Sequence, residues 1–102
     1  MSHSAGARFD RLVWIMHTLR GPDGCPWDRE QDWASIAPHT IEEAYELADA
    51  IARGEPEAVR DELGDVLFQV VFQSRIAEER GLFDFDAVAA SIADKLERRH
   101  PH

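Results

Sequence analysis

The sequence predicts an all-α protein of four to five helices. Apolar residues recur at the three- and four-residue spacing of a helix in four separate segments. Glycine or proline follows each segment, where these residues commonly end helices. At 102 residues the chain is long enough for one domain with a modest core. We therefore expect a single domain over residues 1–102, built from helices and their connections.

The first predicted helix lies before Gly21. Its apolar residues fall on one face of a helix: Phe9, Leu12, Val13, Met16 and Leu19. Gly21 and Pro22 do not readily continue a helix, so we expect the helix to end there. The next segment, Gly21–Ala37, is rich in glycine, proline, aspartate and tryptophan, a composition that predicts an ordered loop.

The second predicted helix begins at about Pro38 or Thr40 and ends at Arg53, with Gly54 as its stop signal. Its inward face is predicted to contain Ala44, Leu47, Ala48 and Ile51. Thr40 and Glu43 also match the capping-box pattern of a helix start. Glu43 therefore has a purely structural alternative role.

The third predicted helix runs from Pro56, a favoured first-turn proline, to Arg80 before Gly81. Residues 66–72 are apolar on nearly all sides, and one polar stripe interrupts this surface. The stripe consists of Glu62, Asp65, Gln69 and Gln73. A helix that is apolar on most sides must be buried on most sides, and three shorter helices can hardly cover it. We expect a second subunit, related by a two-fold axis, to complete the core.

The fourth predicted helix covers Asp84–Arg99, with Asp84 as its cap and Pro101 beyond its end. Lys95, Arg98 and Arg99 are three or four residues apart, so they share one side of this helix. These cations could contact phosphate oxygens. They could equally well complement the dipole at the end of the helix.

The charge of the chain restricts its partners. The formal net charge is −9 and the isoelectric point is about 4.8, which disfavours nucleic-acid backbones and anionic membranes as partners. An anionic substrate would have to bind through a metal ion. Cys25 is the only cysteine, which excludes an intrachain disulfide and fits a reducing compartment. No segment reaches membrane-spanning length, and we expect a cytoplasmic protein.

Two acidic motifs on the second and third predicted helices are the most informative functional feature. Glu43 and Glu46 are three residues apart, as are Glu62 and Asp65, so each pair projects from one helix face. If the helices pack antiparallel, the four carboxylates converge. A divalent cation such as Mg²⁺ or Mn²⁺ would relieve their mutual repulsion. For either motif alone, an acidic face that is merely solvated is the alternative.

Two further side chains are candidates for binding a substrate. Trp27 could stack on a base, although large aromatic residues near loops are more often packing anchors. His39 precedes the second predicted helix and could reach a phosphate, although a single histidine is more often structural.

Several motifs resemble the amino-terminal domain of the MazG family of all-α nucleoside triphosphate pyrophosphohydrolases. The two acidic motifs match the signature of that family. The similar segments are LRGPDGCPWD at 19–28, ELGDVLFQVVF at 62–72 and KLERRHPH at 95–102. The resemblance covers nearly the whole chain. It implies a MazG-like bundle of four to five helices that is completed by dimerisation, as a homodimer or a higher homo-oligomer.

The resemblance also implies an activity, which is the Mg²⁺-dependent hydrolysis of an NTP or dNTP to NMP and pyrophosphate in nucleotide-pool housekeeping. Mn²⁺ is a possible substitute. The positions that match the metal ligands are Glu43, Glu46, Glu62 and Asp65. Glu42 matches an additional acid that could orient or deprotonate the attacking water or help to bind a second ion. The expected catalytic residues are Glu42 and Glu43. The expected substrate-binding residues are Trp27, His39, Lys95, Arg98 and Arg99.

Two departures from the family pattern favour an alternative to an efficient enzyme. The segment 31–33 is Gln-Asp-Trp, where amino-terminal domains usually have Gln-Thr-His. Ala93 occupies a position where catalytically competent second domains often carry asparagine. The alternative is a catalytically attenuated module for nucleotide binding or oligomerisation. The resemblance further suggests that the chain corresponds to the first domain of a longer two-domain protein.

Overall fold

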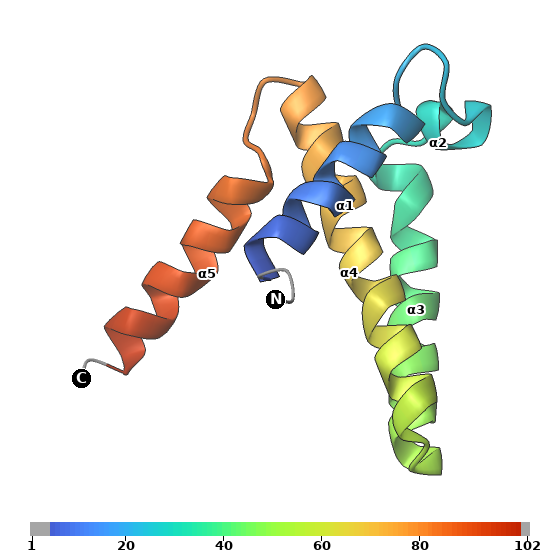
Figure 1. The fold of residues 1–102 in the computed structure, drawn as a ribbon, viewed down its shortest axis with the longest axis vertical. Coiled ribbons are helices and arrows are strands. Elements are labelled where there is room, and N and C mark those ends of the chain that lie inside the picture. The colour runs from blue at the N-terminus through green and yellow to red at the C-terminus, as the bar shows by residue number, and fades with distance from the viewer. Residues whose placement is uncertain (1–4, 101–102) are drawn as a thin grey trace.

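Five helices and no strand make up residues 5–100, the part of the chain that this computed structural model describes (Figure 1). The helices are α1 (Ala5–Leu19), α2 (Pro26–Glu30), α3 (Trp33–Arg53), α4 (Pro56–Glu79) and α5 (Phe85–Arg99). The all-α prediction is confirmed. Within the described residues, none of the helices combines the length and the apolar character that crossing a membrane requires.

The helices α3 and α4 form an antiparallel hairpin and lie side by side in Figure 1, and α4 also contacts α1 and α5. The turn between them depends on Gly54, whose φ of 67° is a left-handed conformation that glycine adopts without strain. Pro56 then begins α4 at a position where its missing N–H has no cost. The predicted bounds of α4 are therefore confirmed to within a residue, because both ends carry local signals.

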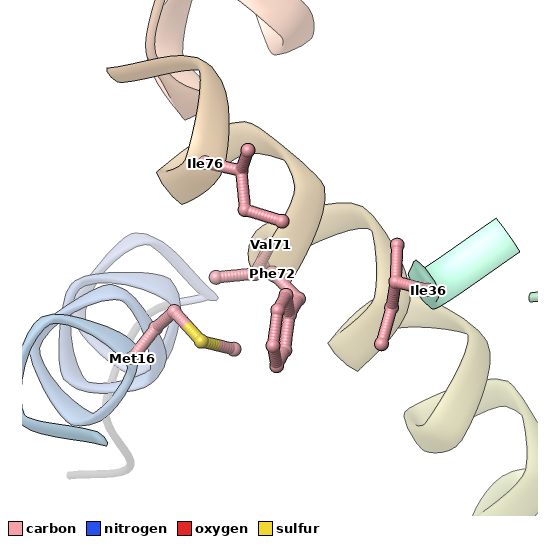
Figure 2. Close-up of a cluster of buried hydrophobic side chains, with 5 residues drawn as sticks. All are labelled: Met16, Ile36, Val71, Phe72 and Ile76. Atoms are coloured by element: carbon pink, nitrogen blue, oxygen red, sulfur yellow. The ribbon is translucent and has the colours of Figure 1, made fainter. Parts of the chain in front are cut away.

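The core lies where α1 and α3 meet α4 (Figure 2). Its fully buried apolar members are Met16 from α1, Ile36 from α3, and Val71, Phe72 and Ile76 from α4. Phe72 is completely inaccessible to solvent and sits between the other two helices. Burial of these side chains provides the main apolar driving force for assembling the three helices.

The prediction of a loop over Gly21–Ala37 is wrong, because this segment contains α2 and the beginning of α3. The Asp32 carboxylate accepts a hydrogen bond from the Ser35 N–H, and the Ser35 hydroxyl accepts one from the Asp32 N–H. This reciprocal capping box starts α3 at Trp33. Pro38, predicted at the start of the helix, lies inside it.

Arg20 holds the connection between α1 and α3 against α4. Its Nε and Nη2 atoms donate to the two carboxylate oxygens of Glu79, both at 2.8 Å. Its Nη1 donates to the backbone carbonyl oxygens of Asp28 and Gln31. Nearby, a Cβ at Gly24 would lie 2.2 Å from the carbonyl oxygen of Leu19, so only glycine fits this tight approach.

The face of α3 that packs on α4 differs from the predicted one. Of the predicted inward residues, Leu47 is half-buried, whereas Ala44 and Ala48 are exposed and Ile51 is 58% exposed. The more buried positions of α3 recur at alternating spacings of three and four residues, and they are Trp33, Ile36, Thr40, Glu43, Leu47 and Ala50. Two polar residues therefore occupy the middle of the α3–α4 contact.

The helix α5 is the least buried of the five. It begins after Asp84, whose carboxylate accepts a hydrogen bond from the Ala87 N–H at 2.9 Å, as the sequence predicted. None of its residues is buried, and a cavity of about 370 Å³ lies between it, α1 and α4. Pro101, predicted to follow the end of this helix, lies outside the described residues.

Candidate metal centre

Three of the four predicted metal ligands converge on one point. The structure brings carboxylate oxygens of Glu43, Glu62 and Asp65 within 4.8 Å of one another. Glu43 comes from α3, and the other two come from α4. This separation allows one divalent cation to contact an oxygen from each residue.

The symmetry of the hairpin explains why these residues meet. Glu43 is eleven residues before Gly54, and Asp65 is eleven residues after it. Residues equally distant from the turn lie opposite each other in two antiparallel helices. Glu62 is one helical turn from Asp65 on the same face of α4, so it joins the same cluster.

The surroundings of Glu43 are unfavourable for a carboxylate that has no cation beside it. Its Oε2 atom is buried and has no hydrogen-bond partner within the described part of the chain. Burial raises the pKa of Glu43 above its ordinary value, and the neighbouring carboxylates of Glu46 and Asp65 raise it further. A buried, unpaired oxygen among other acids is costly unless a cation binds it.

Glu62 is perturbed by the same neighbours. Its pKa is raised mainly by hydrogen bonding to Asp65, then by burial and by the charges of Glu46, Asp65 and Glu43. Glu46, the fourth predicted ligand, therefore lies close enough to act on the cluster electrostatically, although it does not belong to the three-residue group.

The chemistry of the donor set fits a hard divalent cation. The three converging groups are all carboxylates, and Mg²⁺ and Mn²⁺ prefer oxygen ligands of this kind. The orphaned oxygen of Glu43 is the specific feature that such an ion would satisfy.

Three other predicted site residues lie close to one another near Glu43, and they are Trp27, His39 and Glu42. His39 Nδ1 is 3.8 Å from Glu42 Oε1, and both residues lie within about one turn of Glu43 on α3. Trp27 from α2 packs its ring edge-on against the His39 ring, with 5.5 Å between their centroids. Trp27 and His39 are exposed, so these side chains are accessible to a ligand.

The predicted phosphate-binding cations lie elsewhere in the single chain. Lys95, Arg98 and Arg99 are exposed on the last turns of α5. Figure 1 shows α5 on the opposite side of α1 and α4 from α3. Within residues 5–100 no hydrogen bond or ion pair joins them to the acidic cluster.

Thr40 is a neighbour of the cluster that the sequence does not reveal. Its spacing from Glu43 predicts a place at the start of a helix, whereas it lies within α3 and contacts Gln69 and Gln73 of α4. The structural alternative for Glu43, capping by way of Thr40, is therefore wrong. The Asp32–Ser35 capping box is the local signal that gives the correct helix start.

Comparisons with known proteins show which family the sequence of the chain resembles. Residues 31–102 match the model of the MazG nucleotide pyrophosphohydrolase domain. The chain is 59% identical over 96 residues to a nucleoside triphosphate pyrophosphohydrolase of Escherichia coli (strain K12). The aligned segment covers 93% of this chain and 36% of that protein. It is 51% identical over 98 residues to the nucleoside triphosphate pyrophosphohydrolase/pyrophosphatase MazG of Thermotoga maritima, covering 96% of this chain and 38% of that protein. The chain thus spans little more than a third of the length of these relatives.

Proposed function

Because this chain belongs to the family of MazG nucleotide pyrophosphohydrolase domains, we propose that it hydrolyses nucleoside triphosphates or their deoxy forms to NMP and pyrophosphate with bound Mg²⁺. The observation that carries this proposal is the convergence of Glu43, Glu62 and Asp65 around a buried, unpaired carboxylate oxygen. Relatives named as nucleoside triphosphate pyrophosphohydrolases support the substrate class. The single cysteine supports a cytoplasmic location.

In this proposal Glu43, Glu62 and Asp65 hold the cation, with Glu46 beside them. When bound, Mg²⁺ supplies positive charge that offsets the negative charge of the triphosphate and of the departing pyrophosphate. Mn²⁺ has similar ligand preferences and is a suitable substitute.

Glu42 remains available to act on water, because it lies outside the three-carboxylate group. We assign it the role of orienting the attacking water and accepting its proton. The water oxygen bonds to the α-phosphorus while the bond from that phosphorus to the bridging oxygen breaks, so pyrophosphate leaves with the bond electrons. To Trp27 and His39 we assign contact with the rest of the nucleotide, because both are exposed, His39 lies beside Glu42 and Trp27 packs on His39.

A second copy of the chain completes this proposed enzyme. Exposed apolar side chains cover much of the hairpin and α5: Ile41, Tyr45, Ile51, Leu63, Val70, Ile92 and Leu96. A homodimer, or a higher homo-oligomer, would bury them. It would also allow Lys95, Arg98 and Arg99 of one copy to approach the phosphates of a nucleotide whose cation is held by the acids of another.

A catalytically attenuated module remains the second candidate. Ala93 and the separation of the α5 cations from the acids within one chain favour it. In this case the chain would bind nucleotide or support assembly as one domain of a longer protein, without turning the substrate over efficiently.

Product analysis tests the activity. The purified chain is incubated with a panel of NTPs and dNTPs plus Mg²⁺, and we expect NMP and pyrophosphate. Glu43→Gln keeps the side-chain shape but removes a ligand charge, so we expect it to lower turnover about 100-fold or more while the fold persists. Glu57→Gln, an exposed change at the start of α4, is the matched control and should retain full activity.

Two other outcomes of the product analysis would count against the proposed reaction. Release of NDP and orthophosphate would contradict attack at the α-phosphorus. Nucleotide binding without NMP formation for any base would favour the attenuated module.

A further inference from the structure

A partly buried polar network joins α3 to α4 beside the acidic cluster. The Nε2 of Gln73 donates to the hydroxyl oxygen of Thr40 at 2.7 Å, and the Thr40 hydroxyl donates to the Oε1 of Gln69 at 2.9 Å. Gln69 is only 5% exposed. Polar groups buried in this way destabilise the fold unless each finds its partner, so the network favours one relative position of the two helices.

Gln73 connects to α3 a second time through its backbone. Its carbonyl oxygen accepts a hydrogen bond from the indole Nε1 of Trp33 at 3.1 Å. Within residues 5–100 these three are the only hydrogen bonds between α3 and α4. The other contacts across this surface are apolar packing, which is not directional, and the approach of the carboxylates of Glu43, Glu62 and Asp65, which is repulsive.

The network is one helical turn from the metal ligands. Thr40 precedes Glu43 by three residues on α3, and Gln69 follows Asp65 by four residues on α4. Pro38 adds a local weakness in α3, because it has no N–H to donate to the carbonyl oxygen four residues earlier. The side-chain bonds to α4 therefore hold α3 just where its own backbone bonding is interrupted.

We infer that Thr40, Gln69 and Gln73 are positioning residues that set the distance between the carboxylate of Glu43 on α3 and those of Glu62 and Asp65 on α4. The inference rests on the proposed function. The carboxylates repel one another and act to separate the helices, whereas the hydrogen bonds fix the helices at one separation and register. Loss of the network should weaken cation binding although every ligand is still present.

Titration of Mn²⁺ into the protein, followed by calorimetry, tests the network without measuring activity. Thr40→Val keeps the side-chain volume but leaves Gln69 and Gln73 without their partner. We expect the Kd for Mn²⁺ to increase about 10-fold. Thr40→Ser keeps the hydroxyl and should restore binding to within about twofold of the wild type.

Thr18→Val is the matched control, because within residues 5–100 the hydroxyl that it removes bonds only to the carbonyl oxygen of Trp14 in α1. It should leave the Kd unchanged. Gln73→Met provides a second test if Thr40→Val fails to fold, since it keeps the chain length and the backbone carbonyl that Trp33 uses. It should weaken Mn²⁺ binding to a similar extent.

Folded variants that lack the network and still bind Mn²⁺ as tightly as the wild type would overturn the inference. Equal loss of affinity in the valine and serine variants would also overturn it, because the hydroxyl would then not be the cause. A wild-type protein that binds no Mn²⁺ would instead refute the proposed metal site itself, and the inference with it.

Discussion

Arg20 shows how one side chain can order a whole connection. Its side chain is 6% exposed, and within residues 5–100 every hydrogen bond that its guanidinium donates goes to the α1–α3 connection or to Glu79 at the end of α4. It also lies over the ring of Phe72, 5.3 Å from the ring centroid. A buried guanidinium is tolerated only with such partners, so the loss of one of them should be costly.

The variant Glu79→Gln tests this arrangement through the pH dependence of the unfolding free energy. Hydrogen bonding to Arg20 lowers the pKa of Glu79 below its usual 4.5, against a smaller opposing effect of burial. The folded state thus binds this proton more weakly than the unfolded state. The stabilisation is complete well above pH 4.5 and is lost as the pH falls through the lowered pKa. Urea titrations at about pH 7 should show that the variant loses about 1.5–3 kcal/mol of unfolding free energy.

At about pH 3.5 the difference between wild type and Glu79→Gln should be clearly smaller. Glu57→Gln, whose carboxylate is exposed at the start of α4, should show no comparable change between the two pH values. A wild-type advantage of the same size at both pH values would show that the charge of Glu79 is not the source of the stability.

Single residues also mark the limit of sequence reasoning about the site. Glu43, Glu62 and Asp65 were predicted as a group because a three-residue spacing reveals a helix face. The roles of Gln69 and Thr40 could not be predicted in the same way. Thr40 and Gln69 bond to each other although they lie 29 residues apart along the chain, and only the register of α3 against α4 brings them together.

At the scale of helices, the errors of prediction have identifiable physical causes. Pro56, Gly81 and Asp84 are strong local signals, and the ends of α4 and the start of α5 were predicted to within a residue. The start of α3 differs from the predicted start at about Pro38 or Thr40 because the composition of the preceding segment is typical of a loop, and because Pro38 lies inside this helix.

The inward face of α3 was misassigned for a different reason. This helix carries an apolar stripe that includes Ala44, Ala48 and Ile51, but α4 packs on the neighbouring face that contains Thr40 and Glu43. Hydrophobic spacing identifies an apolar stripe and does not say which helix covers it. Polar residues within a packed surface are the places where such patterns are expected to fail.

At the scale of the whole molecule, one chain leaves much apolar surface uncovered. The helix α5 has no buried residue, and Ile92 and Leu96 on it are about half exposed. The cavity between α5, α1 and α4 is large enough to hold several side chains. These features support the proposed dimer, in which a second copy supplies the missing packing.

Analytical ultracentrifugation at micromolar concentration tests the assembly, and we expect at least a dimer. Ile92→Asp places a charge in the exposed apolar stripe of α5 and should shift the population towards monomer, by about 10-fold or more in the dimer Kd. Ala34→Asp adds the same charge at an exposed position on α3 and should leave the mass unchanged. A wild-type chain that is a stable, well-folded monomer would refute the dimer.

The hairpin connection at Gly54 has a consequence for folding kinetics. Glu43 and Asp65 are 22 residues apart, so the chain closes only a short loop to bring them together, whereas α1 must pack on α4 across a much longer separation. The α3–α4 pair is therefore the expected folding nucleus, and carboxylate repulsion should raise its barrier. In stopped-flow refolding, Mg²⁺ should accelerate the wild type and have little effect on Asp65→Ala. If Mg²⁺ only slowed unfolding, the acids would have to meet after the rate-limiting step rather than during it.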